Sequence, residues 1–281
     1  MRFGSDTFGL LVAVIALLIG ALTSNIFGDP APPPEPQASV RRPAPTQPPP
    51  VRPAPVPPSG DPVVQIDIGP KHDSSGTAFP VGVGVWMTAR HVVDGCAKIG
   101  IVTSPKRAVR GDAVIVHDNA DLALFRSSVR AAPVAVGDDD LRVGQAGYHF
   151  GFPKGQPGAM RSRLLGSGTM RLSGRYSTRE PILAWAEITR VPDTDGPLSG
   201  ISGGPVFDAA GRLVGVHVAG SLRRGRSFTT APQSMRELWS QAGVSTVTDG
   251  PVPALTDRDF ASAGERLRQD LIVAKAICLT R

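Results

Sequence analysis

From Val63 to about Gly243 the chain is a succession of short apolar runs separated by Gly, Pro, Asp and Asn. Runs of this length suit β-strands, and their close spacing predicts an all-β barrel or sandwich. Roughly 180 residues are enough for two small barrels packed together. The predicted strands are Val63–Ile68, Gly84–Ala89, Ala113–Val116, Leu122–Arg126, Gly147–Phe150, Leu183–Ile188 and Leu213–Ala219.

Two helices are expected after the last of these strands. Pro232 is a favourable first-turn residue, and a helix is predicted over Gln233–Gln241. In the tail, residues 244–281, the pair Thr256 and Asp259 has the spacing of a capping box. We expect the tail helix to dock on the barrels through one apolar face, which would carry Phe260, Gly264, Leu267, Leu271 and Cys278.

The N-terminal 28 residues contain an uncharged stretch, Phe8–Phe27, preceded by Arg2. Twenty residues at helical rise span the hydrocarbon core of a bilayer. We therefore predict that residues 1–28 are a signal anchor, and a cleaved signal peptide stays open because the strongly apolar part is shorter. Either alternative exports the rest of the chain, to the periplasmic face of a bacterial inner membrane or to the periplasm itself.

Residues 29–62 hold more than half of the 28 prolines in the chain. Such a segment does not bury apolar surface and tends towards the polyproline II conformation, so it is predicted to be a disordered linker. The predicted organisation is an anchor (1–28), this linker (29–62), a β-rich domain (63–243) and a C-terminal extension with an amphipathic helix (244–281).

The net charge of +6 does not indicate a nucleic-acid-binding protein. The basic residues are scattered apart from two short clusters, Arg41–Arg42 and Arg223–Arg226, and aromatic side chains do not alternate with them. A nucleic-acid groove needs a longer basic stripe and stacking platforms. No nucleic-acid partner is therefore predicted.

The chain has two cysteines, Cys96 and Cys278. In an exported protein this pair is compatible with a disulfide that closes a very long loop, and two buried free thiols are the alternative. Two cysteines and five dispersed histidines show no metal-ligand spacing, so no metal site is predicted.

Three segments carry the residues of a nucleophilic catalyst. His91 ends the segment Thr88-Ala-Arg-His, Asp121 opens Asp-Leu-Ala-Leu, and Ser202 lies in Gly200-Ile-Ser-Gly-Gly-Pro. Acyl transfer to a serine needs a base that titrates near neutrality and a carboxylate that orients this base. We predict that His91, Asp121 and Ser202 form a catalytic triad, with the backbone N–H groups of Gly200 and Ser202 as the oxyanion hole.

These motifs, in this order, resemble those of the trypsin/chymotrypsin superfamily, especially its exported bacterial members. The resemblance runs from about Ser75 to Ala242 and includes Gly76-Thr-Ala-Phe and Phe228-Thr-Thr-Ala-Pro. It implies two six-stranded antiparallel β-barrels, with the triad in the cleft between them and no cofactor. It also implies the roles of the three residues. Ser202 would attack the scissile carbonyl, His91 would transfer the proton, and Asp121 would hold the imidazole tautomer.

The predicted function is that of a serine endopeptidase that acts on a protein or peptide substrate. A protease-fold module that binds exported proteins without cleaving them is the alternative from another class. The segment Gly200-Ile-Ser-Gly-Gly also fits the nucleophile elbow of α/β-hydrolases, but that fold places its acid and histidine after the serine. Only His217 follows Ser202, so the esterase alternative is set aside.

Side-chain preference is expected to depend on the strand Leu213–Gly220. In the resembled superfamily this strand lines the primary specificity pocket, and Val218, Ala219 and Gly220 would pair with the substrate backbone. His217 matches the pocket histidine of glutamyl endopeptidases and picornavirus-type cysteine proteases, which implies a preference for Glu or Gln. Pro197 stands where those relatives usually carry Thr, and Gly196 where trypsin-like enzymes keep an Asp. A small apolar or a basic preference therefore stays open.

Overall fold

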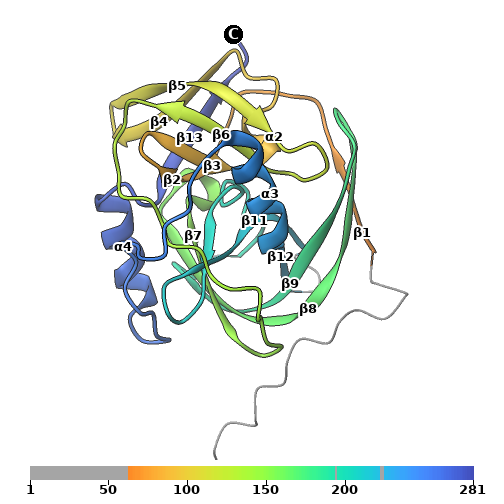
Figure 1. Cartoon of the computed structure of the whole chain (residues 1–281), viewed down its shortest axis with the longest axis vertical. Helices are drawn as coiled ribbons and strands as arrows, with labels where there is room; N and C mark the ends of the chain where they lie inside the picture. Colours follow the sequence, from red (N-terminus) through yellow and green to blue (C-terminus); the bar gives the residue numbers. More distant parts are fainter. Residues whose placement is uncertain (1–62, 194, 222–224) are drawn as a thin grey trace, which may run out of the picture. The chain divides into compact units, whose positions relative to one another are not determined.

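The computed structural model describes residues 63–193, 195–221 and 225–281 (Figure 1). The predicted anchor, 1–28, and the predicted linker, 29–62, lie outside the described residues. Within the described ranges, no helix has the length and apolar character needed to cross a bilayer.

The first barrel is a closed ring of six antiparallel strands in the order β13-β2-β3-β6-β5-β4. The last strand of the chain, β13, pairs with β2 on one side and with β4 on the other, so it closes the ring. The strands are β2 (Ser74–Gly82), β3 (Val85–Thr88), β4 (Lys98–Ser104), β5 (Arg107–Val116), β6 (Ala123–Ser127) and β13 (Ala274–Leu279).

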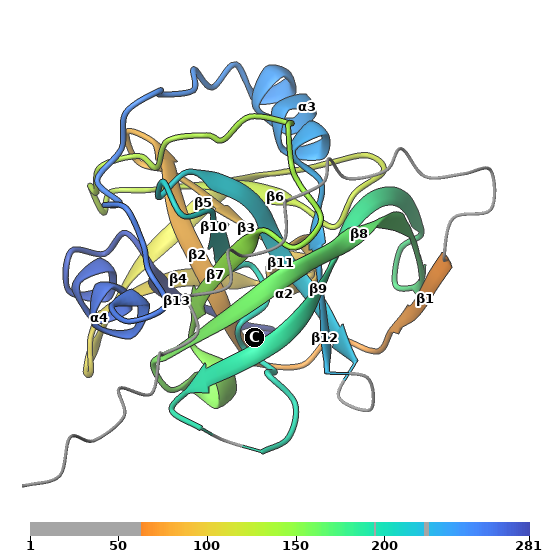
Figure 2. The same ribbon diagram turned by 90° about the horizontal axis from the view of Figure 1, so that it is seen from below.

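The second barrel follows along the chain (Figure 2). Its strands have the order β8-β7-β10-β11-β12-β9, and pairing of β8 with β9 closes the ring. An additional strand, β1 (Val63–Ile68), runs parallel to the end of β8. The ring strands are β7 (Ala146–Gly151), β8 (Gly158–Gly174), β9 (Thr178–Val191), β10 (Pro205–Phe207), β11 (Leu213–Ser221) and β12 (Arg226–Thr230). The predicted all-β, double six-stranded barrel is confirmed.

In the described part of the chain, three helices and one 3-10 turn accompany the barrels: α2 (Arg90–Val93), η1 (Pro153–Gly155), α3 (Pro232–Ala242) and α4 (Phe260–Gln269). The helix predicted after Pro232 is confirmed as α3. It ends at Gly243, whose φ of 64° is the left-handed conformation that glycine adopts most readily.

The tail differs from the prediction at its end. The predicted helical face included Leu271 and Cys278, but α4 stops at Gln269 and Cys278 belongs to β13. Leu271 leaves the helical conformation with a φ of 57°. Beyond it, Ala274, Ala276 and Cys278 are buried with less buried residues between them, which is the two-residue period of a strand.

The tail helix docks as expected, and it packs on the core that the two barrels share. Phe260, Ala263 and Leu267 are buried in the same apolar cluster as Phe150 and Phe207. Gly264 is required at this contact, because a Cβ there would lie 2.7 Å from the ring of Phe150. The tail is therefore part of the folded body of the protease-like domain.

The sulfur atoms of Cys96 and Cys278 are bonded at 1.99 Å. Cys96 follows helix α2, and Cys278 lies in β13, so the bond joins two segments that are 182 residues apart in sequence. It links the loop beside His91 to the strand that closes the first barrel.

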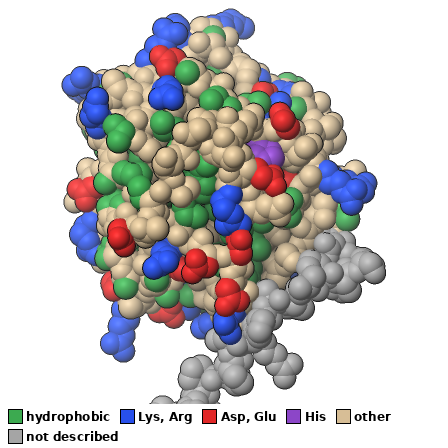
Figure 3. All heavy atoms as spheres, viewed as in Figure 1, with side chains coloured by type: hydrophobic (Ala, Val, Ile, Leu, Met, Phe, Trp, Pro, Cys, Tyr) green, Lys and Arg blue, Asp and Glu red, His purple; other side chains and the backbone are tan. Residues whose placement is uncertain are grey.

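Charged side chains are scattered on the face of the molecule seen in Figure 3. Lys and Arg side chains alternate there with acidic and apolar ones, and they form no continuous basic stripe on that face.

Candidate active site

His91 lies in the short helix α2, three residues after Thr88, the last residue of β3. Its ring Nδ1 is 2.6 Å from Oδ2 of Asp121, and its backbone N–H donates to Oδ1 of the same carboxylate at 2.9 Å. The backbone N–H of Arg90 also donates to the carbonyl oxygen of Asp121, at 3.1 Å. Because Nδ1 donates to the carboxylate, Nε2 of His91 is left as the acceptor that a general base needs.

Asp121 is 1% exposed and lies two residues before β6, which begins at Ala123. Its Oδ1 also accepts a hydrogen bond from the hydroxyl of Tyr176, at 2.8 Å. Burial alone would raise the pKa of Asp121, but the charge of His91 and the hydrogen bonds from His91 and Tyr176 together hold it below its ordinary value. Asp121 is thus held as a carboxylate.

Glu180 lies directly behind Asp121 and is also 1% exposed. Its Oε1 accepts the backbone N–H of Asp121 at 2.8 Å, and its Oε2 has no hydrogen-bond partner in the described part of the chain. Burial and the neighbouring charge of Asp121 raise the pKa of Glu180 well above its ordinary value. Two carboxyl groups therefore share this region, one ionised and one neutral.

Tyr176 and Glu180 were not predicted from the sequence. Tyr176 lies in the turn between β8 and β9, and Glu180 lies in β9, so both belong to the second barrel. Asp121 belongs to the first. The guanidinium of Arg90 lies 4.1 Å from the centre of the Tyr176 ring. No local motif marks these residues, because their role arises only when the two barrels pack together.

Two cationic side chains, Lys71 and Arg175, form hydrogen bonds to the backbone of helix α2 at His91. The Nζ of Lys71 donates to the backbone oxygen of His91 at 3.0 Å, and Arg175 donates to the same oxygen at 3.3 Å. Burial, followed by the charge of Arg175, lowers the pKa of Lys71 to about 8. These residues line a cavity of about 330 Å³ that also contacts His91 and Ser202.

Ser202 lies in a tight loop held by both barrels. The hydroxyl of Thr77 donates to the oxygen of Gly200 at 2.9 Å, and the N–H of Thr77 donates to the oxygen of Ser202 at 2.8 Å. Gly203 has a φ of 83°, and a Cβ there would lie 2.1 Å from the Thr88 hydroxyl oxygen. Only glycine therefore fits beside the serine on this side.

The predicted reactive groups of this loop are not engaged elsewhere in the fold. Among the described residues, the Oγ of Ser202 makes no hydrogen bond, and neither do the backbone N–H groups of Gly200 and Ser202. The structure thus brings Ser202 and His91 to one cavity without a hydrogen bond between their side chains.

The predicted pocket residues occupy two different environments. His217, Ala219 and Gly220 line a cavity of about 150 Å³ together with Ser202. Val218 is buried instead in an apolar cluster with residues of both barrels. On the side that faces β10, no described strand pairs with β11 beyond Val216, because β10 pairs only as far as that residue.

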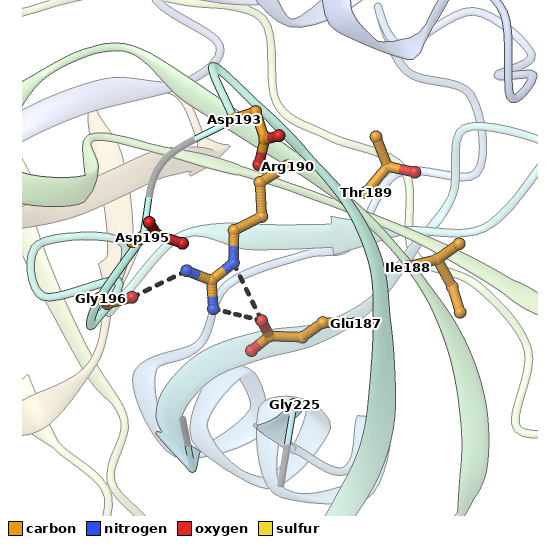
Figure 4. Close-up of a pocket in the computed structure, with 8 residues that line it drawn as sticks. All are labelled: Glu187, Ile188, Thr189, Arg190, Asp193, Asp195, Gly196 and Gly225. Carbon is orange, nitrogen blue, oxygen red and sulfur yellow. Dashed lines mark hydrogen bonds and ion pairs between the residues drawn. The ribbon is translucent and has the colours of Figure 1, made fainter. Parts of the chain in front are cut away.

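An ion pair that was not predicted lies at the end of this cavity. The Nε of Arg190 is 3.0 Å from Oε2 of Glu187, and its NH1 group donates to the oxygen of Gly196 at 2.7 Å (Figure 4). The hydroxyl of Ser227 donates to Oε1 of Glu187 at 2.7 Å. The same ion pair borders a neighbouring cavity of about 610 Å³.

His217 is 2% exposed, and burial, with smaller contributions from His91 and Arg190, lowers its pKa to about 3. It is therefore neutral at physiological pH. Within the described ranges, no group of three or more His, Cys, Asp or Glu side chains could hold a metal ion.

A sequence model of the family described as "Trypsin-like peptidase domain" matches residues 76–216. The chain belongs to the trypsin-like peptidase family. The matched range contains His91, Asp121 and Ser202, and it ends just before His217.

Two curated relatives are similar to this trypsin-like peptidase. An uncharacterized protein y4bJ of Sinorhizobium fredii is 28% identical over 145 residues, which are 51% of this chain and 21% of the relative. Protease Do-like 1, chloroplastic, of Arabidopsis thaliana is 28% identical over 139 residues, which are 47% of this chain and 30% of the relative. The chain spans less than a third of either relative's length.

Solved structures of similar fold include the Rv3671c protease of M. tuberculosis in its active form, with a TM-score of 0.49 and 19% identity. That alignment covers 61% of this chain and 74% of the other. The HtrA-type protease AlgW with a decapeptide aligns with a TM-score of 0.47 and 22% identity, over 60% of this chain and 51% of the other.

Proposed function

We propose that this trypsin-like peptidase is an endopeptidase that hydrolyses peptide bonds through an acyl-enzyme on Ser202. The observation that carries the proposal is the paired contact of Asp121 with the ring and the backbone of His91, beside a cavity that Ser202 also lines. A buried carboxylate with this geometry favours the ring tautomer whose Nε2 can accept a proton.

In the proposed reaction, Nε2 of His91 takes the proton of the Ser202 hydroxyl while Oγ attacks the scissile carbonyl carbon. The negative charge that develops on the carbonyl oxygen is stabilised by the N–H groups of Gly200 and Ser202. The imidazolium, stabilised by Asp121, then gives its proton to the departing amine. Water repeats the sequence on the ester, which releases the acid and restores Ser202.

We further propose that the substrate binds as an added strand along Ala219 and Gly220. Among the residues that the structure describes, no strand pairs with this edge of β11 on the side facing β10. Main-chain hydrogen bonds to such an edge are a common mode of peptide recognition. The substrate side chain before the scissile bond would enter the cavity lined by His217. A preference for Glu or Gln is proposed from this histidine.

Membrane attachment is proposed from the uncharged N-terminal stretch alone, with the protease domain on the periplasmic side of a bacterial inner membrane. Fractionation of the full chain and of a chain without residues 1–28 tests this proposal. Recovery of both in the soluble fraction would contradict it.

Labelling with a fluorophosphonate tests the catalytic proposal. The full chain should react covalently, and Ser202→Ala should abolish the label. On peptide substrates, Ser202→Ala and His91→Ala should each lower kcat by a factor on the order of 10⁶. Labelling that persists in Ser202→Ala would show that another residue is the nucleophile.

A non-catalytic binding module is the alternative, and one observation favours it. In the described part of the chain, no hydrogen bond joins the Ser202 hydroxyl to His91. A folded protein that binds peptides and stays unlabelled would support this alternative over the protease.

A further inference from the structure

A buried chain of polar groups leads from the proposed specificity pocket into the second barrel. The Nδ1 of His217 is 3.4 Å from Nδ1 of His149, and Nε2 of His149 is 2.7 Å from the Oγ of Ser162. The Ser162 hydroxyl is in turn 3.1 Å from the backbone oxygen of Gly147. His149 and Ser162 are fully buried, so solvent does not compete for these contacts.

One arrangement of protons satisfies all three contacts. The oxygen of Gly147 can only accept, so the hydroxyl hydrogen of Ser162 points to it. The Oγ of Ser162 must then accept from His149, which places a hydrogen on Nε2 of that ring. Burial and the neighbouring His217 hold the pKa of His149 well below its ordinary value, so the ring is neutral and its Nδ1 is an acceptor.

The tautomer of His217 follows from that of His149. Since Nδ1 of His149 accepts, Nδ1 of His217 must carry the hydrogen of this contact. A neutral His217 then has a lone pair on Nε2. This atom has no hydrogen-bond partner in the described ranges, and the residue lines the cavity that Ser202 shares.

The Arg190–Glu187 ion pair does not make the cavity favourable for a carboxylate. The guanidinium would attract a substrate carboxylate, but Glu187 lies within hydrogen-bond distance and carries the opposite charge. The pair adds no net charge to the cavity. A carboxylate entering the cavity would therefore meet the lone pair of His217 with no net positive charge beside it to offset the repulsion.

We propose that His217 acts as a hydrogen-bond acceptor and selects a side-chain amide, so that glutamine is preferred over glutamate before the scissile bond. The inference rests on the proposed protease function and names the substrate class of that site. An amide offers two N–H donors, whereas a carboxylate can only accept. With glutamate, Nε2 of His217 and the substrate carboxylate would both be acceptors, and no hydrogen would lie between them. This loss should lower kcat/KM for glutamate by about 10-fold or more relative to glutamine.

The ring tautomers can be measured without any activity. In ¹⁵N-labelled Ser202→Ala protein at pH 7, two-bond ¹H–¹⁵N correlation spectra should show the hydrogen of His217 on Nδ1 and that of His149 on Nε2. A hydrogen on Nε2 of His217 overturns the proposal. This result is independent of whether Ser202 is a nucleophile.

Paired peptides that differ only in Gln or Glu at the position before the scissile bond test the preference. Wild-type enzyme should favour Gln, and Ser162→Ala should reduce this ratio because His149 loses the acceptor that fixes its tautomer. Ser173→Ala, on an exposed part of the same strand, is the matched control and should leave the ratio unchanged.

Equal or faster cleavage of the Glu peptide overturns the proposal, as does a fluorophosphonate-labelled enzyme that cleaves neither peptide. An unlabelled protein contradicts the proposed protease instead. The affinities of the two peptides for that protein then replace kcat/KM, with tighter binding of Gln expected and equal binding overturning the inference.

Discussion

Asp121 lies where the two barrels meet, and its carboxylate accepts three hydrogen bonds. Its carboxylate accepts from the ring and the backbone of His91 and from the hydroxyl of Tyr176, while its own N–H donates to Glu180. A buried carboxylate needs such donors, because burial without them would favour its protonated form. The second barrel thus supplies two of the groups that position the acid of the first.

The neutral Glu180 beside this carboxylate predicts a pH-dependent stability. Its raised pKa means that unfolding above about pH 4.5 releases a proton, so the free energy of unfolding falls as pH rises. The maximum slope is about 1.4 kcal/mol per pH unit. Glu180→Gln keeps the acceptor for the N–H of Asp121 and removes the titration.

We therefore expect Glu180→Gln to be more stable than wild type, by a margin that is larger at pH 8 than at pH 5. Urea unfolding of Ser202→Ala protein at the two pH values measures this margin. Glu265→Gln, an exposed change on α4, is the control and should show no such trend. A margin that is constant with pH would mean that Glu180 is ionised in the folded protein.

Some residues of this region can be recognised from the sequence and others cannot. His91, Asp121 and Ser202 each lie in a short motif, so they could be recognised locally. Tyr176, Glu180 and Arg190 have no motif, and their contacts depend on how strands distant in sequence meet. The sequence also placed His217 in the pocket, but its hydrogen-bonding character depends on His149 and Ser162 behind it.

At the scale of elements, β13 is the feature with the largest structural effect. It pairs with β2 and β4, so the first barrel is closed only when the tail is in place. Its buried residues face the interior of that barrel, with Ala276 fully inaccessible and Leu279 37% exposed. The same substitution at the buried Ala276 and at the exposed Leu279 therefore distinguishes disruption of the barrel interior from an effect on the strand as such.

Ala276→Asp should lower the free energy of unfolding by roughly 3–5 kcal/mol, because it places an unpaired carboxylate inside the barrel. Leu279→Asp, on the exposed end of the same strand, should cost far less. Urea denaturation followed by tryptophan fluorescence compares the two. Equal losses would indicate that β13 does not close the barrel in solution.

Elements with clear periodicity were predicted well, and those without it were not. The strand Val63–Ile68 and the helix after Pro232 were found with the expected bounds, within a residue or two. The strand β13 was missed because Ala-Lys-Ala-Ile-Cys-Leu is short and begins only five residues after the last residue of α4, so its cysteine also fits a helical face. Its pairing partners lie far away in sequence, where local patterns give no information.

At the scale of the whole described domain, the Cys96–Cys278 bond closes a loop of 182 residues. In the chain-entropy account, a bond across so long a loop stabilises the folded protein by roughly 4–5 kcal/mol. We expect the double variant Cys96→Ser, Cys278→Ser to lose stability of that order in urea. Dithiothreitol should destabilise wild type similarly and leave the double variant unaffected. A wild-type urea midpoint that does not move on reduction would contradict this expectation.

The position of β13 also has a consequence for synthesis on the ribosome. The barrel that carries His91 and Asp121 lacks its sixth strand until residue 279 has been translated. Its other five strands are complete by residue 127. Nascent chains fold as units once their segments are complete, so the second barrel can form first. The ring around His91 and Asp121 is therefore completed by a strand that is translated after the whole of the second barrel, in whichever compartment the chain folds.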